Sequence, residues 1–121
     1  MITGGNATVF VANMDRAVEF YTGVLDLKLT SRYGDFWATV AAGNGFTIGL
    51  HPASPKRPEP GTAGAVMVGL EIEGTMEDCL ERLSRHGVKP EGSIERDQGG
   101  VFAHVRDPDG NAFYLWENAS A

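Results

Sequence analysis

The sequence predicts an α+β domain of two βαβββ modules that form a cupped mixed sheet with helices on its outer face. Two observations support this prediction: one order of strand-like and helix-like segments occurs twice, and a proline-rich segment separates the copies. A chain of 121 residues can bury the core of one ordinary domain. We expect one domain over 1–121, with module one at about 1–51, a linker at 52–62 and module two at about 63–121.

Module one begins with strand-like alternation over residues 6–12. Asn13 follows at a position where its side chain can cap a helix, which we expect from Met14 to about Leu25. Strand-like runs then occur at about 27–33, 36–42 and 46–51, and the turn Ala42–Gly45 joins the last two.

Module two repeats this order from a strand at 65–72. Thr75 and Asp78 resemble a capping box for a helix from Met76 to His86, which Gly87 ends. The remaining strands are expected near 89–96, 101–106 and 112–117.

The run Asp107–Asn111 separates the last two strand-like segments. Pro108 fixes φ near the value that a turn needs and Gly110 can adopt a positive φ, so we expect a β-hairpin here. Aligning Ala42 with Asp107 matches the apolar positions of the two modules without gaps. This alignment places Gly49 on Tyr114, Thr39 on His104 and Trp37 on Phe102.

Composition excludes several classes of protein. A net charge of −6 argues against nucleic-acid binding, which needs clustered Lys and Arg. No apolar run approaches the roughly 20 residues of a membrane span, so we expect no membrane partner. The single cysteine, Cys79, excludes an internal disulfide and favours a reducing compartment, so we expect a cytoplasmic protein.

Three features together resemble the vicinal oxygen chelate superfamily: the paired βαβββ plan, the segment 13–21 with Val24, Leu25 and Leu27, and the run Asp107–Asn111. This superfamily contains glyoxalase I, extradiol dioxygenases, fosfomycin-resistance transferases and bleomycin-resistance proteins. The resemblance covers nearly the whole chain. It implies the fold, which these proteins share, and not one function.

The resemblance also implies where a divalent metal would be held, namely by His, Glu or Gln on the first and last strand of each module. Carried over by position, these sites fall on Asn6, Gly49, Met67 and Tyr114. Glycine offers no donor, thioether sulfur is soft, and a neutral phenol ligates such metals only in unusual sites. We therefore expect no metal and no cofactor.

Strand alternation places aromatic, thioether and hydroxyl side chains on the same face as these positions. Such a cleft suits a planar aromatic ligand, because stacking contributes about 0.5–1.5 kcal/mol per ring beyond area burial. We expect ligand contacts from Phe10, Trp37, Thr39, Thr47, His51, Met67, Phe102, His104, Tyr114 and Trp116, with Asn6, Thr8, Gly49, Gly69 and Glu71 on the same face. Alternatively, the aromatic side chains fill a core or a dimer interface.

The leading hypothesis is a metal-independent protein that sequesters a planar aromatic ligand, and the negative net charge favours a cationic one. It resembles the bleomycin-resistance branch, which implies antibiotic resistance and a homodimer. One alternative is a lyase, isomerase or dioxygenase that uses a divalent metal, or acid–base chemistry by His104 and Tyr114. His104 is the catalytic candidate, although the sequence shows no orienting Asp for it.

Two further hypotheses about the function remain. A displaced metal site could use His51, His104 and Glu71. The protein could also be a non-catalytic interaction subunit that buries its aromatic face against a partner.

Overall fold

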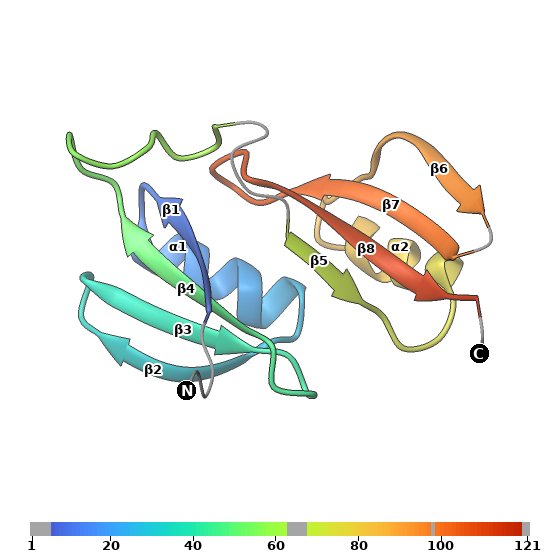
Figure 1. Cartoon of the computed structure of the whole chain (residues 1–121), viewed down its shortest axis with the longest axis horizontal. Coiled ribbons are helices and arrows are strands. Elements are labelled where there is room, and N and C mark those ends of the chain that lie inside the picture. The colour runs from blue at the N-terminus through green and yellow to red at the C-terminus, as the bar shows by residue number, and fades with distance from the viewer. Residues whose placement is uncertain (1–5, 63–67, 98, 120–121) are drawn as a thin grey trace, which may run out of the picture. The chain divides into compact units, whose positions relative to one another are not determined.

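The computed structural model describes residues 6–62, 68–97 and 99–119. Its first half contains β1 (Ala7–Val11), α1 (Met14–Glu19), η1 (Phe20–Val24), β2 (Lys28–Tyr33), β3 (Trp37–Ala41) and β4 (Thr47–Pro52). Its second half contains β5 (Val68–Glu71), α2 (Met76–Ser84), β6 (Glu91–Asp97), β7 (Gly100–Arg106) and β8 (Ala112–Asn118). The α+β class and the repeated βαβββ order are therefore confirmed (Figure 1).

Each module forms its own four-stranded mixed sheet, with the orders β1-β4-β3-β2 and β5-β8-β7-β6. In both sheets the first strand pairs in parallel with the last, and the remaining neighbours are antiparallel. Contacts divide the chain into two compact units. Unit 1 comprises the residues up to Thr62 with Pro108–Asn111, and unit 2 comprises the rest.

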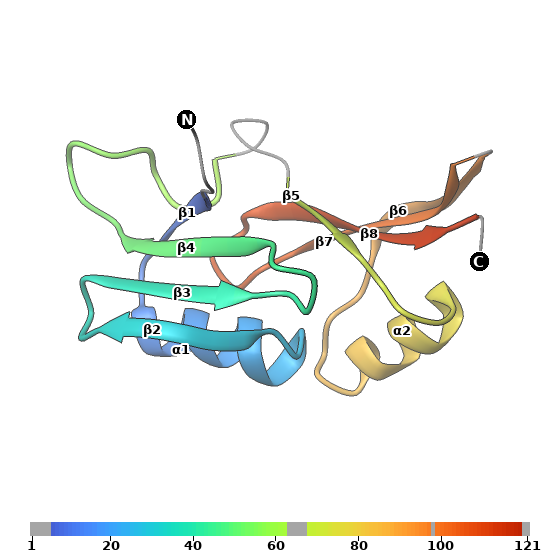
Figure 2. The same cartoon turned by 60° about the horizontal axis from the view of Figure 1, so that its bottom comes forward.

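One face of each sheet is buried beneath the helix of its own module, α1 on β3 and β4 and α2 on β7 and β8 (Figure 2). Alternate residues point to this face because side chains in a strand alternate with a period of two. The buried set in unit 1 is Val9, Val11, Ala38, Val40, Ile48 and Leu50. The corresponding set in unit 2 is Val68, Leu70, Ala103, Val105, Phe113 and Leu115.

Both predicted helix caps are confirmed. The Asn13 side chain accepts a hydrogen bond from the Arg16 backbone N–H, and the Thr75 hydroxyl accepts one from that of Asp78. None of the helices in the described parts of the chain is long and apolar enough to cross a membrane.

The expected continuous α-helix from Met14 to Leu25 is wrong in its second half, which is a π-helix. The Thr22 hydroxyl donates to the Val18 carbonyl at 2.7 Å and so competes with the backbone ladder, and the Leu25 N–H bonds the Phe20 carbonyl five residues back. The wider turn accompanies burial of two adjacent rings, Phe20 and Tyr21.

The predicted hairpin at Asp107–Asn111 is confirmed, since β7 and β8 pair antiparallel on either side of it. Residues Pro108–Asn111 of the turn belong to unit 1. Asp109 Oδ1 accepts hydrogen bonds from the Ala12 N–H at 3.1 Å and from Arg16 Nη2 at 2.7 Å. Asn111 donates to the Phe10 carbonyl at 3.0 Å and accepts from the Gly61 N–H at 2.8 Å.

The pairing of strands confirms the predicted alignment of the two modules. Thr39 lies opposite Gly49 across β3 and β4, and His104 lies opposite Tyr114 across β7 and β8. The two copies therefore share one register on their sheets, and their open faces can be compared position by position.

Candidate functional site

The open face of each sheet, opposite its helix, carries the side chains that alternation predicted to contact ligand. Most of these residues are half-buried. Unit 1 carries Phe10, Trp37, Thr39, Thr47 and His51, and unit 2 carries Phe102, His104, Tyr114 and Trp116. Met67 lies outside the described residues.

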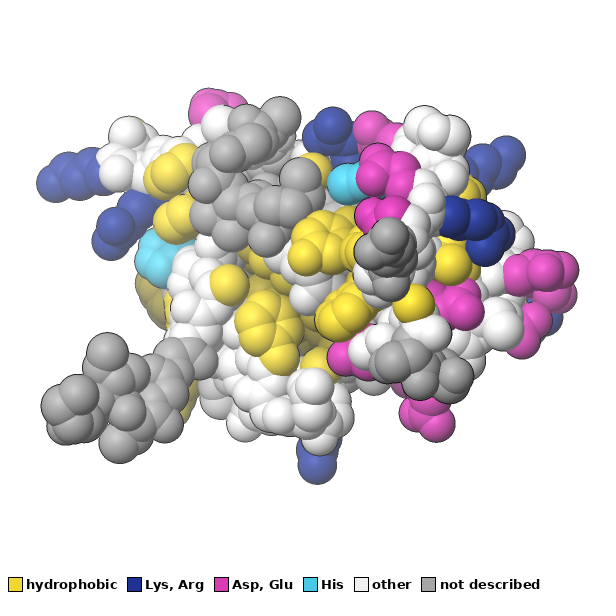
Figure 3. Space-filling model, turned by 45° about the vertical axis from the view of Figure 1, so that its right-hand side comes forward, with side chains coloured by type: hydrophobic (Ala, Val, Ile, Leu, Met, Phe, Trp, Pro, Cys, Tyr) yellow, Lys and Arg dark blue, Asp and Glu magenta, His cyan; other side chains and the backbone are white. Residues whose placement is uncertain are grey.

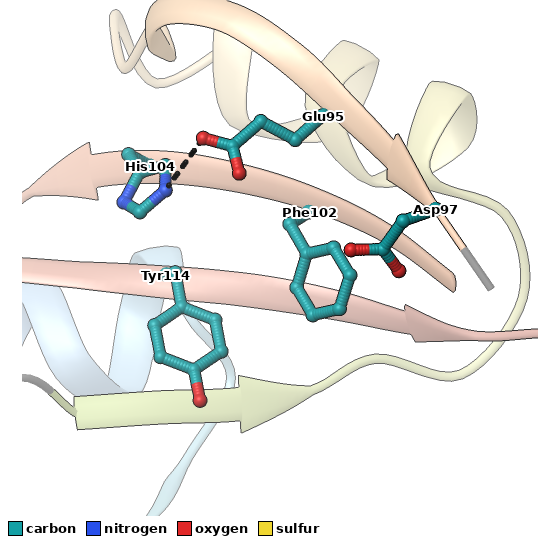
Figure 4. Close-up of a pocket in the computed structure, with 5 residues that line it drawn as sticks. All are labelled: Glu95, Asp97, Phe102, His104 and Tyr114. Carbon is teal, nitrogen blue, oxygen red and sulfur yellow. Dashed lines mark ion pairs between the residues drawn. The ribbon is translucent and has the colours of Figure 1, made fainter. Parts of the chain in front are cut away.

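Unit 2 has a pocket of about 210 Å³ on this open face. Its lining residues come from three strands: Glu95 and Asp97 from β6, Phe102 and His104 from β7, and Tyr114 from β8 (Figure 4). It thus gathers three of the predicted contact residues together with two carboxylates.

Aromatic rings cover the side of the pocket next to the sheet. The Phe102 and Tyr114 rings have centroids 6.2 Å apart, and the His104 and Tyr114 rings have centroids 6.1 Å apart. Phe102 also stacks in parallel on Trp116 at 6.4 Å, and the Trp116 indole N–H donates to the Gly99 carbonyl at 2.9 Å. Trp116 therefore packs beside Phe102 on the neighbouring strand.

The acidic edge of the pocket was not predicted. Glu95 Oε1 lies 3.5 Å from Nε2 of His104, and Asp97 accepts a hydrogen bond from the Gly99 N–H at 2.7 Å. Acidic side chains likewise border exposed hydrophobic side chains on the face shown in Figure 3. The alternation Glu95-Arg96-Asp97 was the available signal, but an irregularity of β6 between Glu91 and Glu95 obscures which face the acids occupy.

Tyr114 lies flat across β5, where Gly69 is its direct partner on the neighbouring strand. A Cβ added at Gly69 would lie 2.5 Å from Oη and 2.7 Å from Cε2 of this tyrosine, and closer still to Cζ. The close-up shows the Tyr114 ring extending from β8 toward β5, with its hydroxyl reaching that strand (Figure 4).

Unit 1 presents a different open face. His51 packs edge-on against Phe10 at 5.5 Å and against Trp37 at 6.3 Å, and its Nδ1 lies 2.8 Å from the Pro52 carbonyl. The Trp37 indole covers Gly49, so a Cβ at Gly49 would lie 2.8 Å from Cζ2 and 3.0 Å from Cζ3.

Three neighbouring hydroxyl groups in unit 1 form hydrogen bonds with one another. Thr39 Oγ1 lies 2.7 Å from Thr30 Oγ1 and 2.6 Å from Ser31 Oγ. The Thr39 hydroxyl therefore forms its hydrogen bonds with residues of the adjacent strand β2.

The positions implied for a divalent metal do not make a metal-binding donor set. Gly49 has no donor and is covered by Trp37, and the Asn6 side-chain oxygen accepts a hydrogen bond from the Thr8 hydroxyl at 3.1 Å. Tyr114 lies across Gly69. Within residues 6–62, 68–97 and 99–119, no three His, Cys, Asp or Glu side chains are grouped to hold a metal ion.

Arg106 pairs with Glu91 on β6. Cys79 lies half-buried on α2, and burial raises the pKa of its thiol, while the nearby Arg82 lowers it by a smaller amount. A thiol whose pKa is raised in this way is a poor nucleophile at neutral pH.

The family model described as "Glyoxalase/Bleomycin resistance protein/Dioxygenase superfamily" matches residues 5–115. No curated protein matches the chain.

Many solved structures share the fold. The antibiotic binding protein TnmS3 from Streptomyces sp. CB03234 is 24% identical, with a TM-score of 0.75 over 98% of this chain and 99% of that one. A superfamily member from Sphaerobacter thermophilus DSM 20745 is 21% identical, with a TM-score of 0.80 over 98% of each chain. A lactoylglutathione lyase from Agrobacterium tumefaciens is 17% identical, with a TM-score of 0.74 over 95% of this chain and 92% of that one.

Proposed function

The chain belongs to the Glyoxalase/Bleomycin resistance protein/Dioxygenase superfamily, and we propose that within it this protein sequesters a planar aromatic ligand without a metal. One observation carries the proposal: the pocket of unit 2 joins three rings, those of Phe102, His104 and Tyr114, on one open face. Ring faces that remain half-exposed can stack on a flat ligand. The antibiotic-binding role of TnmS3, a protein of the same fold, is consistent with this proposal.

The proposed ligand is cationic. Glu95 and Asp97 place two carboxylates beside the rings, and a cation over an aromatic face gains about 0.5–2 kcal/mol from the ring quadrupole. The net charge of −6 adds long-range attraction for a cation. Both carboxylates are exposed, so their contribution should weaken as salt concentration rises.

The test is a fluorescence titration with proflavine, a planar tricyclic cation, and with acridone, its neutral counterpart. Wild-type protein should bind proflavine more tightly, and the double variant Glu95→Gln with Asp97→Asn should lose about ten-fold in proflavine affinity, or about 1.4 kcal/mol. The control is Glu77→Gln, which removes an exposed carboxylate from the first turn of α2. Absence of binding, or equal affinity of wild type and double variant, would contradict the proposal.

Metal independence has its own test. Protein purified without chelator should contain first-row transition metal well below one ion per chain by elemental analysis, because the implied ligand positions include Gly49 and Asn6. Proflavine affinity should be unchanged by EDTA. A near-stoichiometric metal that EDTA removes together with binding would overturn this part of the proposal.

A second candidate function is acid–base catalysis, favoured by the 3.5 Å approach of Glu95 to His104. A carboxylate beside an imidazole can orient the ring for proton transfer, as in many general-base pairs. Tyr114 lies beside the same imidazole. A turnover assay would discriminate the two functions, since a substrate converted equally fast by wild type and His104→Ala would remove this base.

We also propose a cytoplasmic homodimer. The resemblance to bleomycin-resistance proteins supports the dimer, and the presence of one cysteine without a disulfide partner in the chain supports the reducing compartment. Sedimentation equilibrium should give twice the chain mass of 13.0 kDa. A monomer at micromolar concentration would contradict the dimer and leave the pocket of unit 2 unaffected.

A further inference from the structure

We infer that Gly69 determines the specificity of the pocket in unit 2, because its missing side chain lets Tyr114 lie flat across β5 and keeps the space beside Phe102 and His104 open. The inference rests on the proposed function for its consequence, namely which ligands fit. The steric part rests on the structure alone. The three atoms nearest to a Cβ added at Gly69 all belong to Tyr114, so Gly69 acts through Tyr114 as a positioning residue.

The backbone does not explain why residue 69 is glycine. The glycines with positive φ include Gly61, Gly87 and Gly110, and Gly69 is not among them, so other residues could adopt its backbone conformation. Its position inside β5 is also one where glycine weakens a strand. The tyrosine explains it: a Cβ at Gly69 would come within 2.5 Å of Oη and 2.7 Å of Cε2, distances that real Cβ atoms do not show.

Displacement of the ring is the cheapest response to such a clash. The clashing atoms belong to the far end of the tyrosine side chain, which can rotate about χ1 while the paired strands stay in place. A ring that leaves β5 either rises from the sheet or turns toward β7. Phe102 and His104 lie on β7, and their ring centroids are only 6.2 Å and 6.1 Å from that of Tyr114. Either rotation takes space from the pocket.

The pocket has little space to lose. Its volume of about 210 Å³ lies below the roughly 300–1,000 Å³ of pockets that enclose drug-sized ligands. A phenol ring that enters it would leave no room for a fused ring system between β7 and β8. Gly69 therefore selects for flat, polycyclic ligands. Such ligands fit in the pocket only while the Tyr114 ring stays across β5.

Unit 1 offers a matched control. Gly49 also lacks a positive φ and is also covered by an aromatic ring, with Cζ2 of Trp37 at 2.8 Å from an added Cβ. A substitution of Gly49 imposes the same kind of clash on another sheet without touching Tyr114. It should therefore reproduce the structural cost of the Gly69 substitution and not its effect on the pocket.

The binding experiment is a proflavine titration of Gly69→Ala, Gly49→Ala, Tyr114→Leu and the double variant Gly69→Ala with Tyr114→Leu. Gly69→Ala should weaken proflavine binding at least ten-fold, whereas Gly49→Ala should change it less than three-fold. In the Tyr114→Leu background the Gly69→Ala change should have no further effect, because leucine lacks the Oη, Cζ and Cε2 atoms that clash. Equal losses in both backgrounds would show that Gly69 acts without the tyrosine and would overturn the inference.

A crystal structure of Gly69→Ala separates this inference from the proposed function. The Tyr114 ring should be displaced from β5 into the pocket, and a ring that stays across β5 would overturn the inference whatever the titration gives. If the ring moves but wild-type protein binds no proflavine, the proposed function fails and the steric inference holds. Should Gly69→Ala not fold, restored folding in the double variant would still assign the clash to Tyr114, and failure of both would overturn it.

Discussion

The open faces of the two modules differ although their strands share one register. In module one Trp37 of β3 covers Gly49 of β4, and in module two Tyr114 of β8 covers Gly69 of β5. Gly49 and Tyr114 occupy corresponding positions, so one copy has a gap where the other has a ring. The glycine that an aromatic ring covers therefore lies on the last strand of module one, β4, but on the first strand of module two, β5. In module two the Tyr114 ring is directed toward β5, and the pocket lies on the β7 side of it.

The edge strands add a difference of charge. Ser31 on β2 lies opposite Thr39, and at the corresponding place on β6 Glu91 lies opposite His104. Tyr33 on β2 corresponds in the same way to Glu95 on β6. Module one therefore presents hydroxyl groups that bond one another, whereas module two presents carboxylates beside rings. The two modules therefore share the order of their strands and differ in the side chains of the edge strands β2 and β6.

The largest expected effect comes from removing the ring that lines the pocket. Tyr114→Ala should lower proflavine affinity at least ten-fold, because it removes one of the three rings available for stacking. Trp37→Ala removes the ring that covers Gly49 in module one, and it should lower proflavine affinity by a smaller factor. Titration of both variants measures the difference.

An equal loss in the two variants would contradict this asymmetry and would indicate that the ligand contacts both open faces. Thermal stabilisation by ligand gives an independent readout, since ligand at 100 times Kd should add about 2.7 kcal/mol to the stability of a binding-competent protein.

A smaller effect is expected at the two corresponding turns. Asp109 in the second turn has a side chain only 4% exposed and receives hydrogen bonds from Arg16 and the Ala12 backbone. Asp109→Ala should lower the free energy of unfolding by about 2 kcal/mol, with the ion-pair share limited because Arg16 is 50% exposed. Urea denaturation measures the change.

The control for this prediction is Asn44→Ala in the first turn, which is exposed to solvent. It should change stability by less than about 0.5 kcal/mol. If the two alanine variants were equally stable, the contacts of the second turn with β1 and α1 would contribute no net stability.

The smallest effect concerns the helices. Counted from their caps Asn13 and Thr75, Ala17 and Cys79 are corresponding residues, and Ala17 is fully buried while Cys79 is half-buried. Burial raises the pKa of the Cys79 thiol, so folding favours its protonated form. Its contribution to stability is complete below the unfolded pKa and is lost as pH rises above about 9.

Thiol labelling of native protein with a disulfide reagent at neutral pH should accordingly be slower than labelling in urea. Equal rates would show that the fold neither shields the Cys79 thiol from the reagent nor raises its pKa. A modest fall of the urea midpoint between neutral pH and pH values above 9 should accompany slow labelling.

The sequence was sufficient to predict the strands, both caps and the correspondence of the modules, since alternation and capping are local signals. It was not sufficient for Glu95 and Asp97, because the irregular pairing of β6 changes which residues share a face. The π-helical turn after Glu19 was missed because its cause lies in one threonine hydroxyl and in the packing of two adjacent rings. The covering of Gly49 and Gly69 depends on side-chain rotamers, which a strand pattern does not specify.

The contacts of the Asp107–Asn111 turn have a consequence for synthesis of the chain. Asp109 and Asn111 bond to Ala12 and Phe10 across 97 and 101 residues of sequence. The amino-terminal module leaves the ribosome long before these partners exist, and contacts of such high sequence separation form slowly. Until then water must satisfy the end of β1. The turn between β7 and β8 completes the hydrogen bonds at the end of β1, so a nascent chain that stops short of Asn111 carries module one without these bonds.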